Sequence, residues 1–437
     1  MGVLHTTQSV CPVCLQRLNA AYVQRDGAVF LEKTCPEHGA FSVPIAHDAA
    51  LFLRWMPQTA NIPPKEALTP SLRGCPYDCG PCAAHQQTAC CVLMEITQRC
   101  NQSCPYCYAS SGASEADDPP LEEIERQLDF LKAQGEGRPF NIQLSGGEPT
   151  VRKDLPLIVK MAVEKGFPYI QLNTNGRRLA DETYARALKK AGVSAVFLQF
   201  DGTTDAIQMK MRGEALLETK LKAIESCRAA RLPVALVPVI TRGVNDGDIG
   251  NIMRLAVHNV DVVKGVHFQP VSYFGRYPGT DDGRFSMFDV LAAIEAQTGG
   301  QFKVEHFAPI ATGHGLCCFT GTFTAEADGT VCATGKAGAA PPDAGDEAMV
   351  ISRDRDFVKS RWTLPDEGPS CCASLDVFLN DIRSRSLTIT AMHFQDAWTL
   401  DLDRVRRCRV QILRDDKLIP FCNYNITSTS GQPLYRT

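Results

Sequence analysis

The residues best suited to chemistry are three cysteines in the run CNQSCPYC: Cys100, Cys104 and Cys107. Their Cys-x3-Cys-x2-Cys spacing places three thiolates on one tight loop, and soft thiolates bind zinc, iron or iron-sulfur clusters. Three thiolates can hold three irons of a cubane [4Fe-4S] cluster and leave the fourth iron open to a small molecule. The spacing alone also fits a structural cluster or a zinc knuckle with a distant fourth ligand.

Further polar motifs follow the cysteine loop at regular intervals. SGGEPT spans residues 145–150, and its two glycines allow the backbone to approach a ligand closely. The next predicted strands also end in polar residues, which lie at the carboxyl ends of the strands, where α/β folds bind ligands. The candidate binding residues from these strand ends, together with MRG at 211–213, are Gly146, Gly147, Glu148, Asn175, Gln199, Asp201 and Arg212.

Alternating apolar runs and amphipathic stretches must position these motifs. Strands are predicted at 91–97, 140–145, 169–174, 195–200, 234–240 and 265–271, and helices at 121–134, 152–165, 181–191, 216–230, 247–259 and 287–297. Six β–α repeats predict an α/β fold with a parallel sheet and right-handed crossovers. Periodicity alone does not decide between a partial barrel and an open, doubly wound sheet.

Over about residues 91–300 the sequence resembles the radical S-adenosylmethionine (SAM) superfamily, on CNQSCPYC, SGGEP and the serial strand ends. The resemblance implies a partial (β/α)6 barrel, a [4Fe-4S] cluster whose open iron binds SAM, and reductive cleavage to a 5′-deoxyadenosyl radical. It also implies that Tyr106 packs on adenine and that Gly146–Glu148 meet the methionine amino group. Asn175, Gln199 and Asp201 become candidates for ribose or substrate contacts. Arg212 becomes a partner for the SAM carboxylate, a task suited to guanidinium.

The flanking motifs resemble a narrower group of that superfamily, which contains archaeal tetraether lipid synthase and pterin C-methylase-like enzymes. The shared order is CPVC…CPEHG, CPYDCGPC, CNQSCPYC and a C-terminal stretch ending in CNYN. This resemblance implies extra iron centres and four segments: a rubredoxin- or zinc-ribbon-like module at 1–48, a linker with a cluster segment at 49–90, the radical SAM core at 91–300, and a C-terminal auxiliary-cluster domain at 301–437. The chain is shorter than expected for such enzymes.

The first module contains Cys11, Cys14, Cys35 and His38 in a Cys-x2-Cys…Cys-x2-His pattern. Three sulfurs and one nitrogen suit a tetrahedral zinc or a mononuclear iron. The two halves of this set flank a predicted hairpin over residues 21–34, which turns at RDG. A module of under about 50 residues would hardly fold without its metal.

A second Cys-x3-Cys-x2-Cys set comprises Cys75, Cys79 and Cys82. Cys90 or Cys91 is the expected fourth ligand, and His85 is a less favoured alternative. The set forms either an auxiliary [4Fe-4S] cluster or a second SAM site. We favour the auxiliary cluster, because no strand with a GGEP partner follows it.

The C-terminal region has seven cysteines, too many for one cluster. Cys408 and Cys422 flank a predicted strand–turn–strand, RVQILRDDKLIP, and match the family pattern best. Their partners are to be found among Cys317 or Cys318, Cys332, and Cys371 or Cys372. The expected ligands of a second auxiliary cluster are Cys317, Cys372, Cys408 and Cys422.

The composition of the chain limits its possible partners and its cellular location. The chain has 437 residues, a net charge of −4 and no apolar run of membrane-spanning length, which argues against nucleic acid and a transmembrane segment but leaves peripheral membrane contact open. Clustered cysteines in a large chain indicate metal chemistry in a reducing compartment, so a cytoplasmic location is expected. Such clusters need a low-potential electron donor such as ferredoxin or flavodoxin.

The sequence thus predicts an enzyme that functionalises an unactivated C–H bond, by C–C coupling or methyl transfer, on a lipid or pterin-like small molecule. One alternative is a radical SAM enzyme that modifies peptides or matures clusters. A second is a non-enzymatic iron-sulfur electron-transfer protein, which would not need SGGEP or Arg212.

Overall fold

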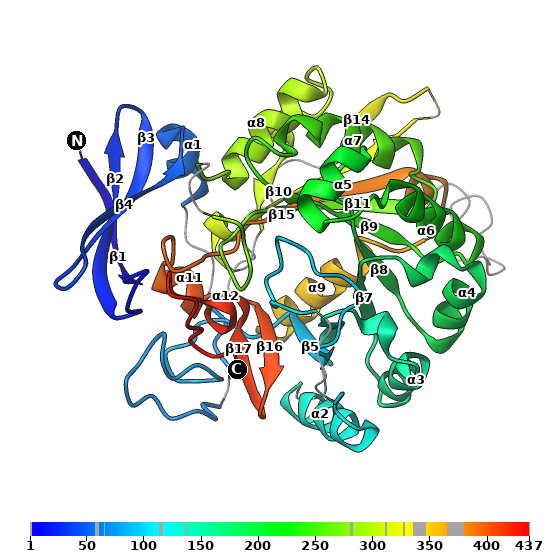
Figure 1. The fold of residues 1–437 in the computed structure, drawn as a ribbon, viewed down its shortest axis with the longest axis horizontal. Coiled ribbons are helices and arrows are strands. Elements are labelled where there is room, and N and C mark those ends of the chain that lie inside the picture. Colours follow the sequence, from blue (N-terminus) through cyan, green and yellow to red (C-terminus); the bar gives the residue numbers. More distant parts are fainter. Residues whose placement is uncertain are drawn as a thin grey trace.

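The computed structural model describes residues 2–56, 61–64, 66–112, 117–135, 137, 139–279, 283–310, 313–326, 328–334, 347–364 and 380–436. Among these residues the strands form a four-stranded sheet near the N-terminus and a 13-stranded sheet. Figure 1 shows the small sheet at one side of the molecule, and helices that pack on the larger sheet at the opposite side of the molecule. No helix in the described ranges is both long and apolar enough to cross a bilayer.

Six parallel strands form the centre of the larger sheet, in the spatial order β11-β9-β8-β7-β6-β5. β5, β8 and β9 are near-continuous apolar runs, as expected of parallel strands covered on both faces, whereas β6, β7 and β11 also contain polar residues. This order agrees with the partial (β/α)6 barrel that the resemblance implies, and its strands and helices begin close to their predicted positions. Their bounds are β5 (Cys91–Thr97), β6 (Asn141–Gly146), β7 (Ile170–Thr174), β8 (Ala195–Gln199), β9 (Val234–Val237), β10 (Val239–Ile240) and β11 (Val263–Pro270).

Helices cover the outer side of the barrel strands, as Figure 1 shows for α2, α3, α4 and α6. Among the described helices between β5 and α8, only α5 was not predicted. It carries Arg212 in its last turn and ends at Gly213, whose φ of 81° suits glycine. Its two turns are too short for a clear helical period. The helices are α2 (Leu121–Gln134), α3 (Leu155–Glu164), α4 (Glu182–Ala191), α5 (Asp205–Arg212), α6 (Leu217–Ala229), α7 (Ile249–His258) and α8 (Met287–Gln297).

The segment after the barrel extends the same sheet at both edges. β15 (Ser386–Met392) pairs parallel with β11, and β13 (Cys318–Ala325) pairs antiparallel with β15. At the other edge β16 (Val410–Arg414) pairs parallel with β5, and β17 (Lys417–Pro420) follows it in a hairpin. Residues 301–437 were predicted to form a separate domain. Their described strands hydrogen-bond directly to the barrel at both edges of the sheet, and the division of the chain into domains stays a prediction.

The remaining elements of this segment are short apart from one helix. They are β12 (Ala308–Pro309), β14 (Val331–Ala333), α9 (Glu347–Ser360), α11 (Leu402–Arg406) and α12 (Phe421–Asn425). The predicted DD turn lies between β16 and β17, where Asp415 and Asp416 both have positive φ, as a type I′ hairpin turn requires.

The N-terminal module is an antiparallel meander of β1 (Gly2–Val10), β2 (Arg17–Arg25), β3 (Ala28–Cys35) and β4 (Gly39–Ala46), followed by α1 (Ala49–Trp55). The predicted hairpin turns at Asp26 and Gly27, both with positive φ. The module docks on the C-terminal segment: buried Lys33 donates to the carbonyls of Ala397 and Trp398, at 2.9 and 2.8 Å.

Candidate active site

Cys100, Cys104 and Cys107 lie on the loop after β5 and line a cavity of about 750 Å³ inside the barrel. Backbone hydrogen bonds join Cys107 to Arg276 in both directions, at 2.9 and 3.0 Å. The Arg276 Nε also donates to the Cys104 carbonyl at 2.7 Å. The loop is therefore fixed at two of its cysteines by the segment that follows β11.

The three thiols suit a metal cluster better than free cysteines. Burial raises the pKa of Cys100 to about 12, and the neighbouring charges of Glu148 and the other two cysteines act in the same direction. Burial also raises the pKa of Cys104. Buried thiols of this kind become thiolates only when a cation compensates their charge.

The SGGEP segment lies directly against the start of the cysteine loop. A Cβ on Gly146 would come within 2.0 Å of the Thr97 carbonyl oxygen, and one on Gly147 within 2.2 Å of the Arg99 carbonyl oxygen. The Gly147 and Glu148 amides donate to those same two oxygens, at 2.8 and 2.9 Å. Both glycines are thus needed for the segment to reach the loop, and their predicted close approach to a ligand stays a prediction.

Glu148 faces the cavity but its carboxylate is committed to the protein. It accepts hydrogen bonds from the Thr150 amide at 3.0 Å, the Thr150 hydroxyl at 2.6 Å and the Thr174 hydroxyl at 2.7 Å. Its second oxygen accepts from the Asn175 amide at 2.6 Å. Glu148 therefore ties the end of β6 to the end of β7, and it supports the cavity wall in addition to any contact with a ligand.

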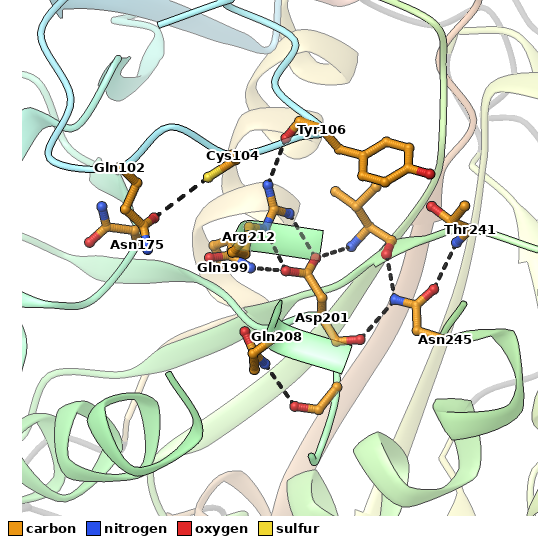
Figure 2. Close-up of polar contacts among 12 residues, drawn as sticks. Gln102, Cys104, Tyr106, Asn175, Gln199, Asp201, Gln208, Arg212, Thr241 and Asn245 are labelled. Carbon is orange, nitrogen blue, oxygen red and sulfur yellow. Dashed lines mark hydrogen bonds and ion pairs between the residues drawn. The ribbon is translucent and has the colours of Figure 1, made fainter. Parts of the chain in front are cut away.

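Arg212 has a different set of partners from the expected one. Its Nε and Nη2 donate to the two carboxylate oxygens of Asp201, at 2.6 and 2.7 Å, and its Nη1 donates to the Tyr106 carbonyl at 3.0 Å (Figure 2). Two of its donors therefore pair with Asp201, and the contact with the SAM carboxylate stays a prediction. The arrangement gives Arg212 the task of holding the cysteine loop by its backbone at Tyr106.

The other predicted polar strand ends meet around a lysine that sequence reasoning missed. Lys220 on α6 is fully buried and donates to the Asn175 carbonyl at 2.7 Å and to Gln199 Oε1 at 2.6 Å. Gln199 also donates to Asp201. Burial lowers the pKa of Lys220 to about 7, against the opposing pull of Asp201. The sequence did contain an indication of this role, because Lys220 lies at helical spacing from the apolar residues Ile224 and Cys227 and therefore on the buried face of the helix.

The N-terminal cysteines form a compact set of metal donors. The ligand atoms of Cys11, Cys14, Cys35 and His38 all lie within 4.8 Å of one another. His38 Nδ1 is 3.6 Å from the Cys11 sulfur and 3.4 Å from the Cys35 sulfur. Donors this close fit one tetrahedral ion with metal–sulfur bonds of about 2.3 Å, as predicted.

Cys75, Cys79 and Cys82, the second predicted set of cluster ligands, are not among the residues that line the central cavity. The Cys75 and Cys79 thiols interact directly, and Asn423 Nδ2 donates to the Cys79 sulfur at 3.0 Å. The predicted fourth ligand is placed elsewhere: Cys90 lines the central cavity, together with Cys91 and Cys318. His85 instead contacts the Cys408 carbonyl, at 3.0 Å.

Cys317, Cys408 and Cys422 all line the cavity that holds the Cys100 loop. The fully buried Arg404 donates from Nε to the Cys317 sulfur at 3.4 Å, and the Gln395 amide donates to the Cys422 sulfur at 3.3 Å. Donors to sulfur are typical of thiolate ligands. The fourth predicted ligand, Cys372, lies outside the described residues.

Comparisons with known proteins agree with this geometry. The radical SAM superfamily model matches residues 94–256, and the HMPTM N-terminal zinc ribbon domain matches residues 3–47. The 7,8-dihydro-6-hydroxymethylpterin dimethyltransferase of Methanocaldococcus jannaschii is 34% identical over 470 residues, which cover 96% of this chain and 93% of that protein. A probable GTP 3′,8-cyclase of Pyrococcus abyssi is 34% identical over 38% of this chain and 52% of its own length.

Among solved structures, Streptococcus suis SuiB is similar with a TM-score of 0.41 and 14% identity, over 48% of this chain and 46% of that one. The similarity to the dimethyltransferase spans nearly the whole of both proteins, and the radical SAM model covers the Cys100 loop and strands β6 to β9. The chain therefore belongs to the radical SAM superfamily, and it carries a zinc ribbon at its N-terminus.

Proposed function

We propose that this protein is a radical SAM enzyme that methylates carbon on a pterin-like small molecule. The observation that carries the proposal is the similarity to a pterin dimethyltransferase across 96% of the chain, which includes the zinc ribbon and the C-terminal cysteines as well as the barrel. A match confined to the barrel would support only the general radical chemistry. The cavity of about 750 Å³ lies within the usual range for small-molecule sites.

The residues of the cavity are suited to hold the implied cofactors. Cys100, Cys104 and Cys107 would bind a [4Fe-4S] cluster, which supplies the electron that cleaves SAM at its open iron. SGGEP presents backbone groups beside that loop, and Arg212 and Arg276 hold the loop in place. The Cys75 group and the Cys317, Cys408 and Cys422 group would bind auxiliary clusters, which need a low-potential electron donor.

The proposal can be tested by following hydrogen transfer from the substrate to 5′-deoxyadenosine, the product of SAM cleavage. This test does not require the source of the methyl group to be known. Dithionite-reduced protein would be incubated with SAM and with 7,8-dihydro-6-hydroxymethylpterin deuterated at its carbon-bound positions. We expect 5′-deoxyadenosine to form and to contain deuterium. Cys104→Ala should abolish it, whereas Cys227→Ala, at a buried position of α6 that does not line the cavity, should not.

The two levels of the proposal can fail separately. Without any 5′-deoxyadenosine from the reconstituted protein, radical chemistry at the Cys100 loop is wrong. If 5′-deoxyadenosine forms but never gains deuterium from the pterin, the chemistry stands and the pterin class is wrong. A deuterated acyl chain tested in parallel would then show whether a lipid is the hydrogen source.

A further inference from the structure

The cavity has a second end, opposite the cysteine loop, which the proposed chemistry does not use. Helix α9 lies across the barrel where the strands begin: Asn141, the first residue of β6, donates to the Arg355 carbonyl at 3.0 Å. Directly after α9, the ring of Trp362 meets Phe197 of β8 edge-on, with centroids 4.6 Å apart. Cys100 and SGGEP follow the opposite ends of β5 and β6, so Arg361 and Trp362 form the floor of the cavity.

Arg361 is a half-buried cation without a counter-ion among the described residues. It lines the cavity, and its Nε is inaccessible to solvent and has no hydrogen-bond partner. Its guanidinium carbon lies 4.5 Å from the centroid of the Trp362 ring and 4.9 Å from that of Phe357. Removing a charged group from water without a counter-ion is costly, even in part, and enclosed charges in proteins are normally paired.

The groups that face Arg361 do not supply the missing negative charge. Its neighbours are the thiols of Cys90, Cys91 and Cys318 and the phenol of Tyr169, and burial lowers its pKa. His267 across the floor is neutral, since burial and the charge of Arg361 lower its pKa to about 3. None of these neighbours in the described part of the chain is a carboxylate.

A second unpartnered polar atom lies on the same side of the cavity. The Thr320 hydroxyl is buried, lines the cavity and has no hydrogen-bond partner. Thr320 pairs across the sheet with Thr390, whose hydroxyl is 2.7 Å from His267 Nδ1. The floor therefore offers a guanidinium fork and a hydroxyl, both of which suit an oxyanion.

We propose that Arg361 binds an oxyanion carried by the substrate, a carboxylate or a phosphate, and so selects an acidic substrate. This inference rests on the proposed function and deepens it: the reacting carbon would lie beside the Cys100 loop, while the acidic group reaches the floor. A neutral 6-hydroxymethylpterin would leave Arg361 unpaired, and an acidic derivative would satisfy it. Arg361 would then be a specificity-determining residue that takes no part in SAM cleavage.

Binding measurements on the anaerobic holoenzyme test the inference. The probes are 6-carboxypterin, the phosphate ester of 6-hydroxymethylpterin and neutral 6-hydroxymethylpterin, with inorganic phosphate and acetate as probes that lack a pterin. We expect one acidic pterin to bind about tenfold more tightly than the neutral one, as a charged hydrogen bond allows. The acid that gains more identifies the oxyanion.

Arg361→Gln should remove the advantage of the acidic ligand and leave neutral pterin binding unchanged, and Arg361→Lys should retain part of it. The matched control is Lys359→Gln, which removes a positive charge from the exposed last turn of α9. Iron content and SAM cleavage without substrate should match the wild type in all three. If Arg361→Gln does not fold, the comparison of Arg361→Lys with the wild type decides.

The inference is overturned if no acidic probe distinguishes wild type from the Arg361 variants. It is also overturned if Arg361→Gln lowers the iron content, since Arg361 would then serve a thiolate-bound cluster. If phosphate or acetate binds in an Arg361-dependent way but no pterin binds, the oxyanion site stands and the pterin part of the proposed function fails.

Discussion

Arg436 forms an ion pair with Glu95 on the first barrel strand, with Arg436 Nη2 at 2.6 Å from Glu95 Oε1. Both side chains are nearly enclosed, at 12% and 5% exposure. The adjacent residue, Tyr435, accepts from the Cys79 amide at 2.8 Å and donates to the Pro76 carbonyl at 2.6 Å. Two consecutive residues therefore connect the Cys75 group to the barrel.

We expect Arg436→Gln to destabilise the protein strongly. The substitution leaves the Glu95 carboxylate buried without its partner, which costs about 3–5 kcal/mol for an enclosed pair. The control is Arg126→Gln, whose ion pairs with Glu123 and Asp416 are exposed and stabilise by about 0–1 kcal/mol. Thermal unfolding of the anaerobic protein measures both. Equal midpoints for the two variants would show that the Glu95 pair does not support the fold.

Substitutions of Arg212 and Asp201 can distinguish two roles for Arg212, which are holding the cysteine loop and binding the SAM carboxylate. If Arg212 holds the cysteine loop through Tyr106, then Arg212→Gln should reduce the iron retained at Cys100, Cys104 and Cys107 and alter its EPR signal. Asp201→Asn should do the same, because it frees the guanidinium from the position that reaches Tyr106. Direct binding of the SAM carboxylate predicts otherwise: the KM for SAM would rise in Arg212→Gln alone, with iron content unchanged.

The zinc ribbon should depend on its metal. Cys35→Ser removes one of four clustered donors, and the small sheet has few other means of closing its hairpins. We expect loss of one equivalent of zinc and rapid hydrogen exchange in β1 to β4. Because Lys33 docks on residues 397 and 398, the thermal midpoint of the whole chain should also fall. Cys332→Ser, at an exposed cysteine, should change neither quantity.

Local patterns were sufficient to predict the strands and helices of the barrel and the residues at its strand ends, whereas the choice of a barrel over an open sheet came from the resemblance to a known family. β5 and α2 have the predicted bounds, since β5 is almost entirely apolar and α2 has a clear helical period. The pairing of β15 and β16 with the two barrel edges was not predictable, because an isolated apolar run does not show which strand it joins. The roles of Arg212 and Lys220 depend on partners distant in sequence, Tyr106 and Asn175, which only the fold brings near.

His267 should make the protein more sensitive to acid. Its pKa is about 3 in the folded chain, chiefly through burial and then through the charge of Arg361, and about 6.5 when unfolded. Below pH 6.5 the unfolded chain therefore binds a proton that the folded chain does not. The free energy of unfolding must fall as the pH falls, by about 1.4 kcal/mol per pH unit from this group.

His267→Gln should lose less thermal stability than wild type between pH 7.5 and 5.5, the range over which midpoints would be compared. His258→Gln, at an exposed histidine in the last turn of α7, is the control and should behave as wild type. If His267→Gln and wild type lose the same stability on acidification, His267 is protonated in the folded protein and the floor of the cavity is more polar than its packing against Phe197 and Trp362 indicates.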